Sequence, residues 1–219
     1  MSGHSVFVTG ANGYLGCRLM PALLARGHRV TALVRPGRES VLPGGCRVLT
    51  GDALDPASFQ DGLGDADTLV HLVGVAHPSP AKAAAFREVD LASLRAAVAA
   101  ARHAGVKHFV YLSVAQPAPL MHAYLAARAE GEALLGASGI ASTILRPWYV
   151  LGPGHRWPLA LLPFYWLAER LPATRQTAQR LGLVSIEQML SALVASVENP
   201  PAERRILDVP AIRRLTHEL

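Results

Sequence analysis

The sequence predicts an α/β protein in which a doubly wound parallel sheet is followed by a small C-terminal lobe. Two observations predict this fold class. A glycine-rich turn joins a short apolar run to a helix near the start of the chain, and apolar runs then alternate with helical segments up to about residue 150. Five or six strands with intervening helices and no internal repeat are typical of a parallel sheet.

Residues 5–35 contain a strand, a glycine-rich turn, a helix and a second strand. Gly10, Gly13 and Gly16 follow the apolar run Val6–Val8 at three-residue spacing. In a dinucleotide-binding turn the first glycine permits the bend out of the strand and the second lets the backbone approach a pyrophosphate. The third lets the helix pack closely on the sheet. The N-terminus of that helix would point its free N–H groups at the phosphates.

The helix after this turn carries a stripe of leucines on one face. Pro21 inside it predicts a kink, Gly27 predicts a left-handed cap, and the run Arg29–Val34 predicts the second strand. This order is what a mononucleotide-binding βαβ unit requires, whereas a glycine-rich turn alone would carry little information. We therefore expect a Rossmann-type dinucleotide-binding domain over 1–150 and a small lobe for substrate or a partner over 151–219.

The segment TGANGYLG has the spacing Gly-x-x-Gly-x-x-Gly and resembles the extended and atypical members of the short-chain dehydrogenase/reductase superfamily, the epimerase/dehydratase-like proteins included. The resemblance covers residues 5–150 and only loosely the remainder. It implies an NAD(P) cofactor. The cofactor contacts that it implies are Gly10, Ala11, Asn12, Gly13, Tyr14, Leu15 and Gly16 in this turn, with Pro147, Tyr149 and Val150 after the sixth strand.

The end of the second strand predicts which cofactor binds. In this fold the residue about 20 positions after the glycines meets the adenosine ribose, and an acidic residue there would bind the 2′-hydroxyl of NAD. This chain has Arg35, whose planar guanidinium suits a 2′-phosphate, and Arg38 lies close enough in sequence to assist. NADP is the predicted cofactor, and two solvated arginines in a turn are the alternative.

Further cofactor contacts are predicted after the third and fourth strands, Arg47–Thr50 and Thr68–Val73. The segment Gly51–Pro56 resembles a family sequence in which an aspartate lies at the adenine edge, which implies roles for Asp52 and Ala53. Asp55 or Ser58 would start the next helix. The resemblance also implies backbone contacts from Leu72, Val73 and Gly74. His71 is interpreted as a core histidine because it lies inside an apolar run.

The remaining elements follow from periodicity and from turn residues. We expect helices over 80–104, 121–137 and 187–197, strands over 108–112 and 142–145, a run over 183–186, and a short last strand over 206–209. The regular alternation ends near Trp148, and an apolar segment occupies 157–171. Its large side chains exceed what a small lobe easily buries, so we expect a homodimer or partner contact there. Burial against the sheet edge of the same chain is the alternative.

Composition narrows the class of protein. The chain has 219 residues, of which 51% are hydrophobic and 17% charged, as in a folded domain with a sizeable core. The net charge is +5, but the basic residues are scattered, so a mildly basic surface for a phosphate-bearing ligand is favoured over nucleic-acid binding. No signal peptide or transmembrane segment is predicted, and we expect a soluble cytoplasmic protein. Cys17 and Cys46 do not form a metal-ligand pattern.

The family that the chain resembles oxidises or reduces carbonyls with a Tyr-x-x-x-Lys pair and a serine after the fifth strand. Tyrosine, whose pKa is normally near 10, needs a neighbouring cation to exchange a proton near neutral pH, and position i+4 places that cation on the same helix face. Tyr124 and Arg128 occupy these places here, with arginine in place of lysine, and Ser113 follows the strand. The resemblance implies these three residues as the catalytic group.

Alternatives stay open at each catalytic position. Tyr124 also fits an ordinary half-buried helix residue, and the position of the working serine could be that of Val114, which has no hydroxyl. His122 or Tyr149 could replace Tyr124 as proton donor. Arginine is not a conservative replacement for lysine, because a larger planar group replaces a compact ammonium.

Two functions are consistent with these residues. The first is an NAD(P)H-dependent oxidoreductase that acts on a small carbonyl or quinone-like substrate. The second is a catalytically silent NADP-binding protein that senses the cofactor or stabilises an assembly. The cofactor motif is intact while the catalytic motif is altered, so the sequence supports cofactor binding more firmly than turnover.

Overall fold

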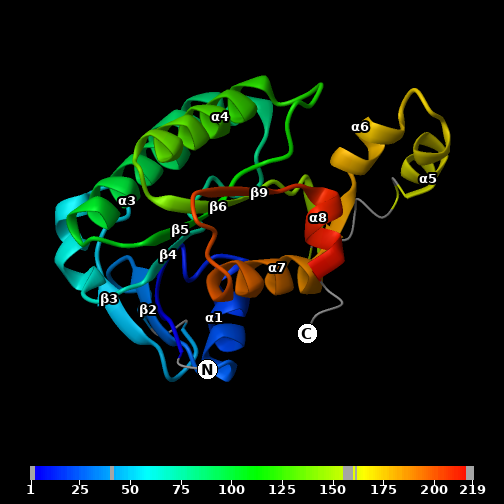
Figure 1. Ribbon diagram of the computed structural model, residues 1–219. Coiled ribbons are helices and arrows are strands. Elements are labelled where there is room, and N and C mark those ends of the chain that lie inside the picture. Colours follow the sequence, from blue (N-terminus) through cyan, green and yellow to red (C-terminus); the bar gives the residue numbers. More distant parts are fainter. Residues whose placement is uncertain (1–2, 40–41, 155–159, 161, 216–219) are drawn as a thin grey trace.

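The computed structural model describes residues 3–39, 42–154, 160 and 162–215. Among these residues a parallel sheet of seven strands forms the centre of the molecule, in the order β3-β2-β1-β4-β5-β6-β9 (Figure 1). The order reverses between β1 and β4, which is the switch point where ligands bind in doubly wound sheets. The strands are β1 (Ser5–Thr9), β2 (Arg29–Val34), β3 (Arg47–Thr50), β4 (Thr68–His71), β5 (His108–Leu112), β6 (Ala141–Leu145) and β9 (Arg204–Leu207).

Helices cover both faces of the sheet, so the predicted fold class is confirmed (Figure 1). One face carries α1 (Gly16–Ala25), α7 (Ile186–Glu198) and α8 (Val209–Arg214), and the other carries α3 (Ala92–His103) and α4 (His122–Ala137). Side chains alternate along each strand, so Val6 and Val8 pack into one core with α1 and α7 while Phe7 packs into the other with α3 and α4.

The local patterns place most elements correctly. Strands β2, β3 and β5 have the predicted bounds, and Gly27 adopts φ 79° just after α1, as a left-handed cap requires. Helix α1 runs through Pro21 without interruption. Strand β4 ends at His71, two residues earlier than predicted. Short 3₁₀ turns at Pro56–Ser58 and Gln60–Leu63 replace the helix expected there, and Asp55 caps the first of them by accepting from Ala57 N at 3.1 Å.

The helix predicted over 80–104 is continuous only in its second half. It begins with a 3₁₀ turn (Pro80–Lys82) and one short turn, α2 (Ala83–Ala85), and then becomes a π-helix over Phe86–Leu91 before α3 starts. A π-helix has more residues per turn, and here Phe86, Asp90 and Leu91 are all buried. Such π turns are rare and often occur at functional sites, and a period of 3.6 residues does not reveal them.

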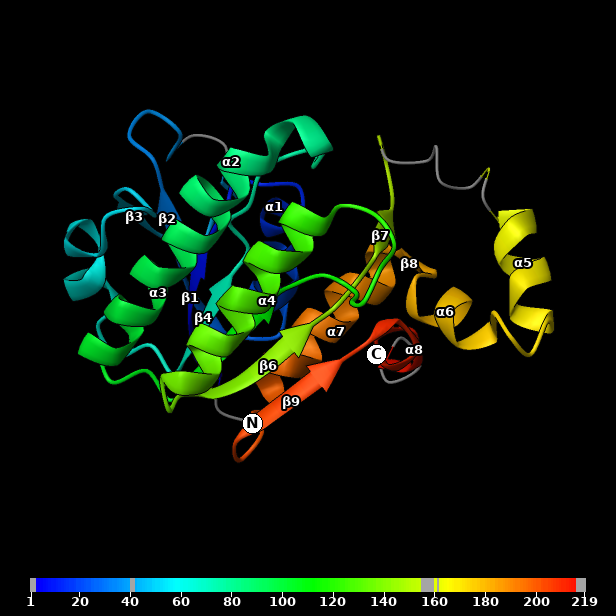
Figure 2. The same cartoon turned by 90° about the horizontal axis from the view of Figure 1, so that it is seen from above.

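The chain after residue 148 contributes to two regions. Strands β7 (Tyr149–Leu151) and β8 (Leu183–Ser185) pair in a small separate sheet, and α5 (Leu162–Arg170) and α6 (Arg175–Arg180) stand to one side of the main sheet (Figure 2). Residues after 185 return to the main body, where α7 packs on α1 and β9 pairs with β6. The predicted division into domains at residue 150 stays a prediction.

The end of the chain differs from the sequence prediction. The last strand spans Arg204–Leu207 in place of 206–209, and Asp208 caps α8, which was not predicted, by accepting from Ala211 N at 2.9 Å. Asp208 therefore stops the strand and starts the helix. Within the described part of the chain, none of the helices has the length and apolar character needed to cross a bilayer.

Candidate functional site

The turn after β1 is packed so closely that only glycine fits at two positions. Gly10 has φ 74°, and a Cβ there would lie 2.8 Å from the carbonyl carbon of Leu72. A Cβ on Gly16 would lie 2.3 Å from the carbonyl oxygen of Gly10. Gly13 closes the turn by donating its N–H to that oxygen at 3.0 Å. The first turn of α1 carries no acidic side chain and no side-chain cap, so its N-terminal N–H groups suit an anion.

A cavity of about 300 Å³ lies beside this turn at the carboxyl ends of β1, β2 and β4. It brings together nine of the predicted cofactor residues from four separate segments: Gly10, Asn12, Gly13, Arg35, Asp52, Ala53, Leu72, Val73 and Gly74. Sequence reasoning missed Leu33, Val34, Gly51, Leu54 and Val89, which also line it. The first four are sequence neighbours of predicted residues. Val89 lies on the π-helix, in a Val-Asp pair that resembles a family sequence lacking its asparagine here, and it was not assigned to the cofactor.

Other predicted cofactor residues lie outside the lining of this cavity. Ala11 and Gly16 are buried behind the turn, and Leu15 packs against the core. Tyr14 lies against the loop after β7, where a Cβ on Gly152 would meet its hydroxyl at 2.2 Å. The phosphate-binding turn is thus in contact with the C-terminal part of the chain.

The segment after β6 holds the last group of predicted cofactor residues. Pro147 accepts a hydrogen bond from Ala115 N at 2.9 Å, which ties this segment to the residues that follow β5. Tyr149 and Val150 lie in β7, and burial raises the pKa of the Tyr149 hydroxyl. All the cofactor roles of these residues stay predictions.

The turn after β2 combines two arginines with an acidic residue. Arg35 lines the cavity, Arg38 is exposed in the same turn, and Arg38 N donates to Arg35 O at 3.2 Å. Glu39 follows, and its carboxylate accepts from Gly37 N at 3.0 Å. Hydrogen bonds from its own backbone N–H and from Gly37 N lower the pKa of Glu39. Glu39 is therefore turned toward the backbone, and the guanidinium of Arg35 is the basic group that lines the cavity. Asp52 orders the facing loop by accepting from Leu54 N at 3.0 Å.

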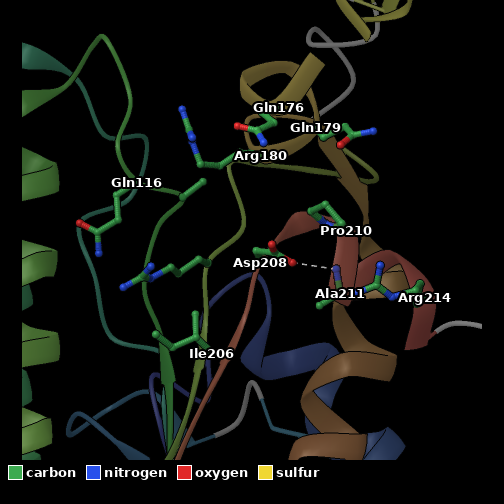
Figure 3. Close-up of a pocket in the computed structure, with 11 residues that line it drawn as sticks. Gln116, Gln176, Gln179, Arg180, Ile206, Asp208, Pro210, Ala211 and Arg214 are labelled. Atoms are coloured by element: carbon green, nitrogen blue, oxygen red, sulfur yellow. Dashed lines mark hydrogen bonds between the residues drawn. The ribbon is translucent and has the colours of Figure 1, made fainter. Parts of the chain in front are cut away.

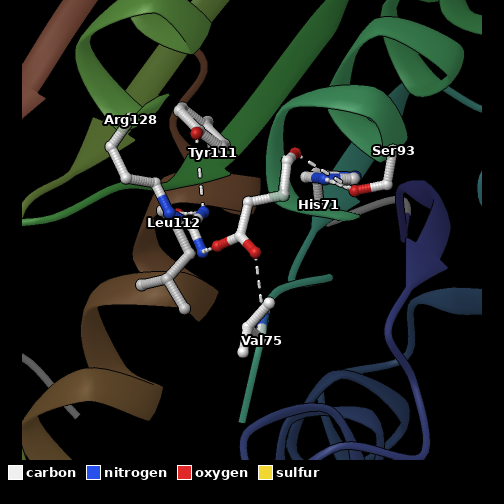
Figure 4. Close-up of polar contacts among 7 residues, drawn as sticks. His71, Val75, Ser93, Tyr111, Leu112 and Arg128 are labelled. Atoms are coloured by element: carbon white, nitrogen blue, oxygen red, sulfur yellow. Dashed lines mark hydrogen bonds and ion pairs between the residues drawn. The ribbon is translucent and has the colours of Figure 1, made fainter. Parts of the chain in front are cut away.

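A buried ion pair lies at the centre of the predicted catalytic group (Figure 4). Arg128 is only 5% exposed, and its Nη2 lies 2.5 Å from Asp90 Oδ1, while its Nη1 donates to Leu112 O at 2.8 Å. The other oxygen of Asp90 accepts from Val75 N at 2.9 Å. The pair therefore joins the π-helix, α4, the end of β5 and the loop after β4.

Burial sets the electrostatics of this pair. Burial raises the pKa of Asp90, and the guanidinium of Arg128 limits that rise. Burial also disfavours the charge of Arg128, but Tyr124, Tyr111 and Asp90 offset this and hold the pKa of Arg128 above its usual value. Arg128 thus stays a permanent cation in a buried site.

Tyr124 lies half-buried beside this cation. Its ring centroid is 5.1 Å from Arg128 Cζ and 4.9 Å from the ring of Phe86. The structure therefore brings Tyr124 and Arg128 together, as the spacing predicts, with the guanidinium over the ring and its two Nη groups bonded elsewhere. The catalytic role of the two residues stays a prediction.

Ser113 is bonded to an acidic residue that sequence reasoning missed. Its hydroxyl donates to Glu132 Oε1 at 2.5 Å, and the serine is 3% exposed. Glu132 also accepts from Gln116 Nε2 at 2.9 Å and from Arg146 Nε at 3.0 Å. A signal was present in the sequence, because residues 124, 128 and 132 lie one helical turn apart on the same face of α4. Ser113 as a catalytic residue stays a prediction.

His71 is a core histidine, as interpreted from the sequence. Its Nδ1 lies 2.8 Å from Thr9 Oγ1 and its Nε2 lies 3.3 Å from Ser93 Oγ. Burial, with a smaller contribution from Arg128, lowers its pKa to about 3, so it is neutral at physiological pH. His122 is exposed at the start of α4. The described residues contain no group of three histidines, cysteines or acids placed to hold a metal ion.

A second cavity, of about 640 Å³, lies between the main sheet and the C-terminal elements (Figure 3). Its walls come from the ends of β5, β6 and β9 and from α6 and α8, and include Gln116, Arg146, Arg180 and Asp208. Ala115, which also lines it, is the residue that bonds to Pro147. The second cavity therefore adjoins the segment after β6 that is predicted to contact the cofactor.

Comparison with known proteins gives a family match over most of the chain. A family described as NAD(P)H-binding matches residues 10–155, which includes the phosphate-binding turn, the first cavity and the Asp90–Arg128 pair.

Two curated relatives are reductases. The ceramide reductase of Caulobacter vibrioides is 31% identical over 199 residues, covering 89% of this chain and 61% of the relative. The 4-hydroxy-2-methyl-3-oxo-4-farnesyl-3,4-dihydroquinoline-1-oxide ketoreductase of Stigmatella aurantiaca is 29% identical over 168 residues, covering 67% of this chain and 50% of the relative. The chain thus spans between half and two thirds of the lengths of these two proteins.

Among solved structures, the Bordetella bronchiseptica enzyme WbmH in complex with NAD+ matches with a TM-score of 0.69 at 22% identity. The match covers 98% of this chain and 79% of that chain. At this identity the likeness shows the fold.

Proposed function

This chain belongs to the NAD(P)H-binding family within the short-chain dehydrogenase/reductase superfamily, and we propose that it is an NADPH-dependent oxidoreductase that reduces a small carbonyl or quinone-like compound. The observation that carries the proposal is the first cavity, where nine residues predicted to contact a cofactor meet beside a turn that only glycine can form. The printed activities of two relatives, a ceramide reductase and a ketoreductase, support reduction of a carbonyl group.

Arg35 favours NADPH over NADH. It lines the cavity at the end of β2, where the adenosine ribose lies in this fold, and its guanidinium can bind a 2′-phosphate through two parallel hydrogen bonds. Arg38 adds a second positive charge in the same turn. Glu39, whose carboxylate would repel a phosphate, is bonded to Gly37 N.

Bound NADPH supplies a hydride, and the residues of the chain must supply the proton. We assign the proton to the hydroxyl of Tyr124. Arg128, with its Cζ 5.1 Å from the ring centroid, stabilises the phenolate that remains after the transfer. We assign Arg128 this electrostatic role because Nη1 and Nη2 are bonded to Leu112 O and Asp90. The hydroxyl of Ser113 donates to Glu132, so Ser113 would orient the substrate oxygen only if that hydroxyl donated to the substrate instead.

One observation favours a second function, a catalytically silent NADPH-binding protein. Arg128 and Ser113 are each bonded to a buried acid, Asp90 and Glu132, so the catalytic group is built into the protein core. A protein of this kind would bind NADPH and transfer no hydride.

One experiment separates the two functions. Titration with NADPH measures binding, and a panel of small aldehydes, ketones and quinones measures turnover with the same sample. Tyr124→Phe should lose at least about 100-fold in rate, since general acid–base groups usually contribute ~10²–10⁴-fold. Tyr165→Phe, on α5, is the matched control. Tight binding with no reduction of any compound would leave the silent binder as the function. Turnover at an unchanged rate in Tyr124→Phe would contradict the role of Tyr124 as proton donor.

The surface of α5 is proposed to contact a second copy of the chain or another protein. The described helix has no buried residue, so it is not buried against the sheet edge of the same chain, and Phe164, Trp166 and Leu167 are between 55% and 71% exposed. Residues 157–159 and 161 of the predicted segment lie outside the described residues. A strictly monomeric mass in light scattering would contradict contact with a second copy and leave another protein as the proposed partner.

Cys17 and Cys46 are free thiols. Disulfides are rare in reducing compartments, so we place the proposed activity in the cytoplasm.

A further inference from the structure

Side chains of arginine and glutamine make up about half of the lining of the second cavity. Three guanidinium groups reach it from three elements: Arg146 from the end of β6, Arg180 from α6 and Arg214 from α8. Three side-chain amides, including that of Gln176, line the same space. We propose that this cavity binds an anionic group, a carboxylate or a phosphate, of the substrate. The proposal rests on the proposed function and names the class of its substrate.

Two of the three arginines are held in place before any ligand arrives. Arg146 donates from Nε and Nη2 to the carboxylate of Glu132, and Arg180 donates from Nε to Pro117 O at 3.0 Å. In each case the bonds engage one edge of the guanidinium, so within the described part of the chain Nη1 of Arg146 and Nη1 of Arg180 remain for a ligand. A guanidinium fixed in this way loses less conformational entropy when it binds an anion.

The charge balance of the cavity favours an anion. Asp208 is the acidic side chain of the lining, and its carboxylate is engaged by Ala211 N at 2.9 Å (Figure 3). Glu132 neutralises Arg146 from behind, and the carboxylate of Asp208 offsets one of the two remaining guanidinium groups, so a net positive charge is left from Arg180 and Arg214. Guanidinium groups bind carboxylates and phosphates through strong charge-assisted hydrogen bonds. A neutral ligand would leave this charge without a partner.

The position of the cavity fits one end of a substrate. It lies at the carboxyl ends of β5, β6 and β9, and ligands bind at the carboxyl ends of parallel strands. Ala115 connects it to Pro147 through a hydrogen bond of 2.9 Å. An anion held by Arg180 and Arg146 would therefore lie near the predicted cofactor residue Pro147, and we place the reacting carbonyl of the substrate on that side.

Binding is tested first on the protein without cofactor, so the result does not depend on turnover. Inorganic phosphate and acetate are titrated separately against sodium chloride at equal ionic strength, and NMR chemical shifts report the affinity. Arg180→Gln and Arg214→Gln should each weaken the preferred anion at least about tenfold, or ~1.4 kcal/mol. Both arginines lie on the surface side of the cavity, and Arg102→Gln, an exposed change on α3, should leave binding unchanged.

Comparison of the affinities for phosphate and for acetate shows whether the anionic group of the substrate is a phosphate or a carboxylate. No binding above that of chloride, or an equal loss in Arg102→Gln, would overturn the proposal. Turnover is tested next with pyruvate and methyl pyruvate, which differ in one negative charge. A preference for pyruvate that disappears in Arg180→Gln supports the proposal. If neither compound nor any member of the aldehyde, ketone and quinone panel is reduced while anion binding still depends on Arg180, the anion site stands and the proposed oxidoreductase function fails.

Discussion

Neutralising Asp90 tests whether its ion pair with Arg128 holds the centre of the candidate site together. In Asp90→Asn the guanidinium of Arg128 would stay buried, at 5% exposure, without its carboxylate. Removing one partner of a buried pair costs about 3–5 kcal/mol, because the remaining charge is uncompensated. With ~2–4 °C per kcal/mol for a chain of this size, the unfolding temperature should fall by ~6–20 °C.

A double-mutant cycle with Arg128→Met separates the pair from its surroundings. Methionine keeps the length of the side chain, and the double variant contains neither charge. We therefore expect the double variant to be more stable than the sum of the single losses predicts, by about 1–3 kcal/mol, measured by urea denaturation. The exposed ion pair Arg95–Glu130 provides the control, because Arg95→Met should cost at most about 1 kcal/mol. Additive losses, or a cost for Asp90→Asn no larger than that of the control, would refute the reasoning.

The cofactor turns and the buried histidines give further predictions. Arg35→Asp should remove a preference for NADPH over NADH of at least about tenfold, measured by calorimetry at one ionic strength; equal affinities in the unaltered protein would contradict the role of Arg35. Gly16→Ala should prevent NADPH binding because its Cβ would lie 2.3 Å from a backbone oxygen, whereas Gly44→Ala, with open space around it, should not. Burial lowers the pKa of His71 to about 3 and of His108 to about 4, against 6.5 when exposed. The unfolded chain therefore binds more protons below pH 6.5, and the free energy of unfolding should fall by about 2 kcal/mol per histidine from pH 7 to pH 5; a flat urea-denaturation profile would contradict this.

Local sequence patterns predict the bounds of several strands of the sheet well. Strands β2, β3 and β5 are apolar runs between turn residues, so their bounds follow from the sequence itself. The position of Gly16 also follows from local constraints, because the turn, the strand and the helix are contiguous. The last strand was harder to predict, because β9 joins the sheet beside β6, about 60 residues earlier in the chain, and the two arginines at its start hide the strand pattern.

The catalytic group could be predicted only in part, because its hydrogen bonds connect residues far apart in sequence. Asp90 and Arg128 are separated by 38 positions, and Ser113 and Glu132 by 19. Spacing places Tyr124, Arg128 and Glu132 on one helix face, but it does not reveal which side chain faces each of them. The π-helix adds a further difficulty, since a 3.6-residue period does not predict that Asp90 turns inward.

The placement of an arginine at position 128 depends on Asp90 and Gly74. A guanidinium carries donors on more than one nitrogen, and Arg128 uses two of them at once, for Leu112 O and for Asp90. The single ammonium of a lysine would offer one nitrogen to the same two acceptors, on a shorter side chain. The larger group also needs room, and it takes the space where Gly74 has no side chain, since a Cβ there would lie 2.5 Å from Arg128 Nη2. Arginine in place of the family's lysine is therefore part of a local arrangement of several residues. The carboxylate of Asp90 balances the charge of Arg128, and the π-helix turns Asp90 inward. Gly74 leaves the space that the guanidinium occupies. Any chemistry at Tyr124 takes place beside a cation whose position this arrangement fixes.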